Sequence, residues 1–280
     1  MNIFSSDRPL IMGILNLTPD SFSDGGQYTE HDVAVKYALR MAQEGADIID
    51  VGGESTRPGS GRVSAEIQKQ RVLPVIGELR KTLPENIIIS IDTTLAEVAD
   101  AALDAGAAII NDISAGRDDP DIVKLAAKHK CPYIIMHMQG TPETMQANPV
   151  YDDVIEEIII FLLERTESVQ KYGIRSQDII IDPGIGFGKT TEHNLEIMAN
   201  LHHFVDTGYP VLLGASRKRF MESICKKATP KELMGATCAT TVIGVAAGVK
   251  LFRVHDVREN RQAADIAWSI YNNSKKNTDS

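Results

Sequence analysis

Eight short runs of β-branched and other apolar residues recur along the chain, and amphipathic helical patterns separate them. The runs lie near residues 9–18, 46–53, 87–93, 108–114, 132–138, 179–185, 210–216 and 251–257. Such alternation is typical of a parallel sheet built from right-handed βα units. Eight units in about 250 residues fit a closed (β/α)8 barrel of the TIM type, and an open doubly wound sheet is the structural alternative.

The pattern favours one domain. A chain of 280 residues could also form two small domains, but no linker rich in Pro, Gly or Ser interrupts the repeat. We therefore predict a single domain over residues 1–280, with a core from about 9 to 272 and a disordered tail at 273–280. The segment 229–232 (Thr-Pro-Lys-Glu) has the signals of a helix start, and 217–225 also has a helical pattern. The seventh unit is thus predicted to contain a broken or doubled helix.

Composition excludes several classes of protein. The formal net charge of -9 argues against a surface that coats nucleic acid. The longest apolar run, Ile158 to Leu163, is far shorter than the roughly 20 residues of a membrane span. Asn16 and Asp20 interrupt the apolar segment near the start, so it does not resemble an export signal. Three cysteines without CxxC spacing suggest neither a disulfide framework nor a zinc site, which favours the cytoplasm.

A barrel places its chemistry at the carboxyl ends of the strands. Nearly every run ends in polar residues that a buried parallel strand would not otherwise contain: Asn16, Glu54, Asp92, Asn111, His137, Asp182, Ser216, and Arg253 with His255. Any one of them could simply cap the next helix. Their presence at all eight strand ends predicts that they converge on one rim.

The cationic residues of this set suit an anion. Arg253 and His255 are two apart on a strand, so both are expected to point into the barrel mouth, where they would bind a phosphate or diphosphate. A surface salt bridge is the alternative for this pair. Lys218 follows the seventh strand where a helix begins, a position that favours anions or carbonyl oxygens.

The acidic residues suit a ligand with N–H donors. Asp92 and Asp182 end very apolar runs, and a poorly solvated carboxylate there requires paired donors. The aminopyrimidine edge of a pterin or guanine supplies such a pair, and Asn111 could bind the rest of that edge.

Three further segments need an interpretation. Loops 18–26 and 53–61 are long for βα loops and contain Phe22 and Arg57, so we predict two mobile lids after the first and second strands. Residues 183–190 almost match a P-loop, but Pro183 stands at the first required glycine, which argues against a nucleoside triphosphate. His137 is not part of an HxH pair, so a zinc hydrolase is not indicated.

Taken together, these segments resemble the dihydropteroate synthase family from about Ile11 to the final helix. The similarity is carried by residues 13–26 (GILNLTPDSFSDGG), 52–59 (GGESTRPG), 91–93 (IDT), 111–112 (ND), 136–140 (MHMQG), 182–189 (DPGIGFGK), 216–218 (SRK) and 253–257 (RVHDV). Two departures, at Ile185 and in the Leu-Ala-Glu segment 95–97, touch no proposed contact.

The resemblance implies a transferase of folate biosynthesis and a sulfonamide target. It would be a cytoplasmic homodimer that condenses 6-hydroxymethyl-7,8-dihydropterin diphosphate with p-aminobenzoate, with the help of Mg2+, to give 7,8-dihydropteroate and pyrophosphate. A pterin-dependent methyltransferase of the same barrel family and a non-catalytic pterin-binding paralogue are the alternatives. Arg253 and His255, which would bind the diphosphate, and the two predicted lids argue against both alternatives.

The resemblance also implies a role for individual residues. Asp92, Asn111, Asp182 and Lys218 would hold the pterin, while Arg253, His255 and, through Mg2+, Asn16 would take the diphosphate. Thr56, Arg57, Pro58, Phe22, Phe187 and Ser216 would surround p-aminobenzoate, and Met136 and Gly214 complete the substrate-binding set. Asp20 and Arg57 would order the lids, and with Asp92, Lys218, Arg253 and His255 they form the expected catalytic set.

Overall fold

The computed structural model describes residues 8–18, 30–55, 59–226 and 228–278. Eight parallel strands form a barrel, as predicted. The strands are β1 (Leu10–Asn16), β2 (Ile48–Gly52), β3 (Ile88–Asp92), β4 (Ile109–Asp112), β5 (Tyr133–Met136), β6 (Ile179–Asp182), β7 (Leu212–Leu213) and β8 (Leu251–Val254). Each lies inside the run that the sequence indicated.

Strand pairing closes the sheet into a ring. The strand order is β6-β5-β4-β3-β2-β1-β8-β7, and every named pair is parallel. An isolated parallel bridge between Ile181 and Val211 joins the two end strands, and the Ile181 N–H donates to the Pro210 carbonyl at 3.0 Å. The alternative prediction of an open doubly wound sheet is therefore wrong for this chain.

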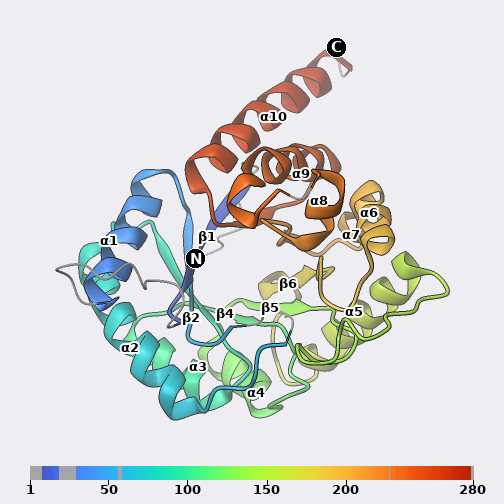
Figure 1. Ribbon diagram of the computed structural model, residues 1–280. Coiled ribbons are helices and arrows are strands. Elements are labelled where there is room, and N and C mark those ends of the chain that lie inside the picture. Colours follow the sequence, from blue (N-terminus) through green and yellow to red (C-terminus); the bar gives the residue numbers. More distant parts are fainter. Residues whose placement is uncertain (1–7, 19–29, 56–58, 227, 279–280) are drawn as a thin grey trace.

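Helices surround the strands (Figure 1). They are α1 (Glu30–Gln43), α2 (Ala65–Thr82), α3 (Ala96–Ala105), α4 (Asp121–His129), α5 (Val154–Gln170), α6 (Thr191–Ala199), α7 (Leu201–Val205), α8 (Arg219–Ile224), α9 (Met234–Ala247) and α10 (Val257–Thr278), with 3-10 turns at Ser176–Asp178 and Pro230–Glu232. Helix α9 packs along α10, which projects away from the barrel and extends past residue 272, where sequence analysis ended the core.

The seventh unit has a divided helix, as predicted. Thr229 and Glu232 form the expected capping box, but this box caps the start of a 3-10 turn, and α9 begins only at Met234. Gly248 ends α9 in the left-handed conformation, at φ +92°. A left-handed residue is the usual way to satisfy the last helical carbonyls, and glycine adopts it without steric cost.

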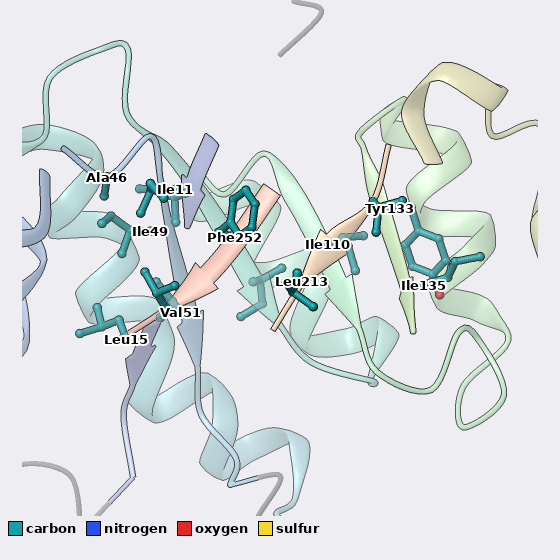
Figure 2. Packing of buried hydrophobic residues seen from close by; sticks show 14 of the residues in the cluster. Ile11, Leu15, Ala46, Ile49, Val51, Ile110, Tyr133, Ile135, Leu213 and Phe252 are labelled. Atoms are coloured by element: carbon teal, nitrogen blue, oxygen red, sulfur yellow. The ribbon is translucent and has the colours of Figure 1, made fainter. Parts of the chain in front are cut away.

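Alternation along each strand separates two faces. Outward residues such as Ile11, Ile49 and Phe252 pack under the helices in one large cluster (Figure 2). The inward residues of the amino-terminal ends form an apolar layer inside the barrel: Leu10, Met12, Ile48, Ile109, Ile134, Ile180, Leu212 and Leu251. Complete burial of such a side chain stabilises the fold by about 1.5–3 kcal/mol.

Two residues further along four of the strands, the same inward face becomes polar. Asp50 follows Ile48, Asn111 follows Ile109, and Arg253 follows Leu251. Asp182 stands in the same relation to Ile180. The apolar layer thus forms the base on which a polar floor rests at the carboxyl ends of the strands.

Candidate active site

The polar floor of the site contains a buried ion triad of Arg253, Asp50 and Asp92. The Arg253 Nε donates to Asp50 Oδ2 at 2.6 Å, and Nη2 donates to Asp92 Oδ2 at 2.7 Å. Asn111 Nδ2 donates to the same Asp50 oxygen at 3.0 Å. Asp50 is completely buried, so the surface salt bridge considered for Arg253 is wrong. A diphosphate would have to be met by the remaining nitrogen, Nη1.

Sequence analysis missed Asp50. It lies in the middle of β2, between Ile49 and Val51, and not at a strand end. A carboxylate inside an apolar strand was the available signal, because a buried charge requires a partner. That partner, Arg253, is 203 positions away in the sequence.

The pKa values of two inward carboxyl groups are raised toward neutral pH. Burial raises the pKa of Asp92 to about 7, although the charge of Arg253 opposes the shift. Burial raises the pKa of Asp182 to about 6, against a hydrogen bond of 2.7 Å from the Gly184 N–H to Oδ1. Both groups lie within the electrostatic field of Lys218.

Lys218 faces these carboxyl groups from the loop after β7. Its Nζ lies 4.0 Å from the centre of the Phe187 ring, close enough for a cation–π contact. Desolvation and the charge of Arg253 lower the pKa of Lys218 to about 8, while Asp182 and Asp92 oppose the shift. A cation of this kind is held ready for an electron-rich or anionic ligand group.

Two contacts fasten the loop of Lys218 to the end of β8. Ser216 Oγ lies 3.0 Å from His255 Nδ1 and accepts the His255 N–H at 3.2 Å. Arg217 binds Asp256 through Nε at 3.1 Å and Nη2 at 2.6 Å. Arg217 also has φ +56°, a left-handed conformation that is uncommon for a residue with a side chain.

The wall of the site is apolar. Met136 and Phe187 belong to a buried cluster with Ile113, Met138 and Met145. Two glycines lie beside the polar side chains of the floor. A Cβ on Gly52 would lie 3.6 Å from Asn16 Oδ1, and one on Gly214 would lie 3.8 Å from Asp182 Oδ2, both ordinary contact distances.

The predicted convergence on one rim is correct for most residues but wrong for two. Glu54 accepts the Val63 N–H at 2.8 Å and Gln68 Nε2 at 3.2 Å, so it fixes the loop before α2. His137 is buried edge-on against Phe161 of α5, with ring centres 5.0 Å apart. His137 directly follows the inward Met136 of β5 and therefore points outward, whereas Glu54 lies beyond the end of β2 and is held by its hydrogen bonds to the loop before α2.

In the P-loop-like segment 183–190, backbone N–H groups donate to side chains of the same chain, so these groups are not free to bind a phosphate. The Gly184 N–H is bonded to Asp182, and the Gly186 N–H donates to Asn194 Oδ1 at 2.7 Å. A Cβ on Gly184 would lie 1.9 Å from the His137 carbonyl oxygen. The glycines at 184, 186 and 188 all have positive φ. They allow close contact with neighbouring loops, which supports the argument against a nucleotide site.

Several predicted residues are not placed. Asp20, Phe22, Thr56, Arg57 and Pro58 lie outside the described residues. A cavity of about 100 Å³ among the described residues is lined by Glu54, Ser55, Ser60, Arg62, Ile113, Thr141, Pro142 and Glu143. It adjoins the apolar wall through Ile113.

The donor set does not form a metal cage. Among the described residues, no three His, Cys, Asp or Glu side chains are grouped so that they could hold an ion. Asn16, at the end of β1, offers one neutral amide oxygen near Asp92.

Comparison with known proteins agrees with this geometry. Residues 12–255 match the family model of pterin binding enzymes, so the chain belongs to that family. It is 45% identical to the dihydropteroate synthase of Synechocystis sp. over 94% of this chain and 91% of that protein.

Two solved structures of dihydropteroate synthases are also similar. The Yersinia pestis enzyme, in a complex with a sulfonamide drug, has TM-score 0.89 and 39% identity, with 95% of each chain covered. The Xanthomonas albilineans enzyme, in complex with 7,8-dihydropteroate, has TM-score 0.85 and 38% identity, with 95% of this chain and 94% of that chain covered. The activity of the chain is that of a dihydropteroate synthase, a transferase.

Proposed function

We propose that the polar floor binds the pterin diphosphate. The observation that supports this assignment is the convergence of Asp92, Asn111, Asp182 and Lys218. In the condensation of 6-hydroxymethyl-7,8-dihydropterin diphosphate with p-aminobenzoate, the two carboxyl groups would accept N–H donors from the pterin. Lys218 would donate to a ring nitrogen or oxygen. Each side chain comes from a different strand end, so the barrel itself sets their spacing.

Loss of the diphosphate is the difficult step. As the C–O bond to the exocyclic carbon breaks, negative charge grows on the diphosphate, and Arg253 Nη1 and His255 are placed to stabilise it. Positive charge spreads over the pterin, and ionised Asp92 favours this charge. Both effects are electrostatic preorganisation, in which groups already held by Asp50 and Ser216 need no reorganisation during the reaction.

In the second step, the arylamine depends more on correct orientation than on a general base. The neutral amine of p-aminobenzoate attacks the exocyclic carbon, the new C–N bond forms as one amine proton passes to the pyrophosphate or to water, and pyrophosphate and dihydropteroate leave. Phe187 and Met136 would form the wall against which the aromatic ring packs, and Ser216 would lie at its edge. Orientation by such a wall lowers the entropic cost of the second step.

Mg2+ fits this site as an ion carried in by the substrate. A single amide oxygen from Asn16 suits an ion that takes its other ligands from phosphate and water. When bound, Mg2+ would supply charge neutralisation for the leaving diphosphate.

A homodimer is supported by apolar side chains that remain exposed on the packed pair α9 and α10. Ile243 of α9 is 47% exposed, and Ile266 and Ile270 of α10 are 64% and 62% exposed. Exposed apolar side chains on two helices that pack together are candidates for a protein interface. Sedimentation equilibrium should give a dimer for the wild type, and an Ile243→Glu, Ile266→Glu variant should shift it to a monomer.

The cytoplasm is the compartment that the cysteines favour. Cys131, Cys225 and Cys238 are free thiols, and Cys225 is exposed. An exposed free thiol suits a reducing compartment. No helix among the described residues is long and apolar enough to cross a membrane.

The decisive experiment follows pyrophosphate release and dihydropteroate formation with Mg2+, with and without p-aminobenzoate. Stoichiometric product that requires p-aminobenzoate is expected. Calorimetry should show weaker pterin diphosphate binding for Lys218→Ala, whereas Lys124→Ala, an exposed control on α4, should bind normally. Unchanged affinity in Lys218→Ala would overturn the pterin site, and tight binding without turnover would point to a methyltransferase or a silent binder.

A further inference from the structure

Lys189, the lysine of the P-loop-like segment, is buried although no phosphate site surrounds it. Only 3% of its surface is exposed. Its Nζ lies 2.9 Å from His137 Nδ1 and donates to the Phe187 carbonyl oxygen at 3.0 Å. The His137 carbonyl oxygen lies 3.5 Å away. A buried ammonium is costly unless its donors are used, and here three acceptors surround it.

These bonds join two loops behind the apolar wall. His137 follows β5, and its neighbours Met136 and Met138 belong to the wall. Phe187 belongs to the same wall and lies beneath the Lys218 ammonium. Lys189 therefore ties the backbone that carries Phe187 to the end of β5.

The protonation states agree with this geometry. Burial and the charge of Lys189 lower the pKa of His137 to about 2, so its ring is neutral and Nδ1 can accept a hydrogen bond. Burial lowers the pKa of Lys189 to about 7, while Asp182 opposes the shift and Lys218 adds to it.

We propose that Lys189 is a positioning residue for the arylamine half of the reaction. By holding the Phe187 carbonyl against His137, it fixes the ring of Phe187 under Lys218 and keeps the wall in place for p-aminobenzoate. It touches neither substrate. This inference rests on the role proposed above for Phe187.

A positioning role predicts that stability and catalysis separate. Met replaces Lys at nearly the same volume and removes both the charge and the donors. A buried charge replaced by a well-packed apolar side chain often leaves a fold as stable as before or more stable. The Phe187 loop nevertheless loses its anchor, and a displacement of about 1 Å can reduce rates by up to about 100-fold.

The test compares Lys189→Met with wild type at saturating pterin diphosphate and Mg2+. We expect the KM for p-aminobenzoate to rise about tenfold or more and kcat to fall, because orientation is lost. The pterin diphosphate KM should change less than about threefold, since Asp182 and Asn111 come from strands. The melting temperature should not fall. Lys124→Met, on the exposed face of α4, is the matched control and should behave as wild type.

A further variant, Phe187→Ala, separates the positioning role of Lys189 from the proposed p-aminobenzoate site. Phe187→Ala should raise the KM for p-aminobenzoate by itself; if it does not, the proposed site fails. If it does while Lys189→Met keeps that KM within about twofold, the positioning role alone is refuted.

If Lys189→Met does not fold, two variants of His137 test the positioning role through the KM for p-aminobenzoate. His137→Asn places an acceptor oxygen near the position of Nδ1 and should retain the wild-type KM. His137→Leu removes the acceptor and should raise that KM. Equal values for the two variants would overturn the inference.

Discussion

Asp182→Asn should stabilise the ligand-free protein while it damages the pterin site. The carboxyl group is buried, and burial raises its pKa from 3.8 to about 6. Each tenfold change in acidity corresponds to about 1.4 kcal/mol, so the ionised group lowers the free energy of unfolding by about 3 kcal/mol at pH 8. The amide keeps an oxygen for the Gly184 N–H and carries no charge.

The sign follows from the direction of the shift. Because the folded-state pKa lies above the unfolded value, the contribution of Asp182 to stability is complete below pH 3.8 and is lost as pH rises through about 6. The wild type therefore loses stability in this window relative to the variant. The difference should be near zero at pH 4 and reach about 3 kcal/mol at pH 8.

Urea denaturation of both proteins between pH 4 and pH 8 measures this difference. Asp104→Asn is the matched control, because Asp104 is exposed on α3. Calorimetry on the same samples should show weaker binding of pterin diphosphate to Asp182→Asn. A variant that is less stable than wild type at pH 8 would refute the argument, because desolvation would then not dominate at this carboxyl group.

Three other predictions concern the floor of the site and the loop after β6. The pH profile of kcat/KM for pterin diphosphate should be bell-shaped, falling below about 7 as Asp92 is protonated and above about 8 as Lys218 loses its proton; a flat profile would contradict these assignments. Asp50→Ala should lower the free energy of unfolding by about 3–5 kcal/mol, because it leaves the charge of Arg253 partly unpaired, and urea denaturation measures the loss. Gly184→Ala should destabilise the fold more than any exposed glycine substitution, since its Cβ would overlap a carbonyl oxygen; an unchanged melting temperature would show that the loop can move.

The sequence alone determined the barrel and the position of its chemistry. Alternation of apolar runs and helical patterns is a local property, and each run contained its strand. Polar residues such as Asp92, Asn111 and Asp182 were recognisable because strand ends in a parallel barrel share one edge. The resemblance then connected these residues with a reaction.

Only the tertiary structure decided which way each side chain points and which partner it meets. His137 ends a run as Asp92 does, but it faces outward, because a shift of one residue moves a side chain to the other face of the sheet. Glu54 lies past the end of β2, where hydrogen bonds to Val63 and Gln68 set its direction. Asp50 and Arg253 lie far apart in the sequence and meet only because ring closure brings β8 beside β1 and close to β2. Long-range pairing of this kind leaves no local signal, since it depends on how the whole barrel closes.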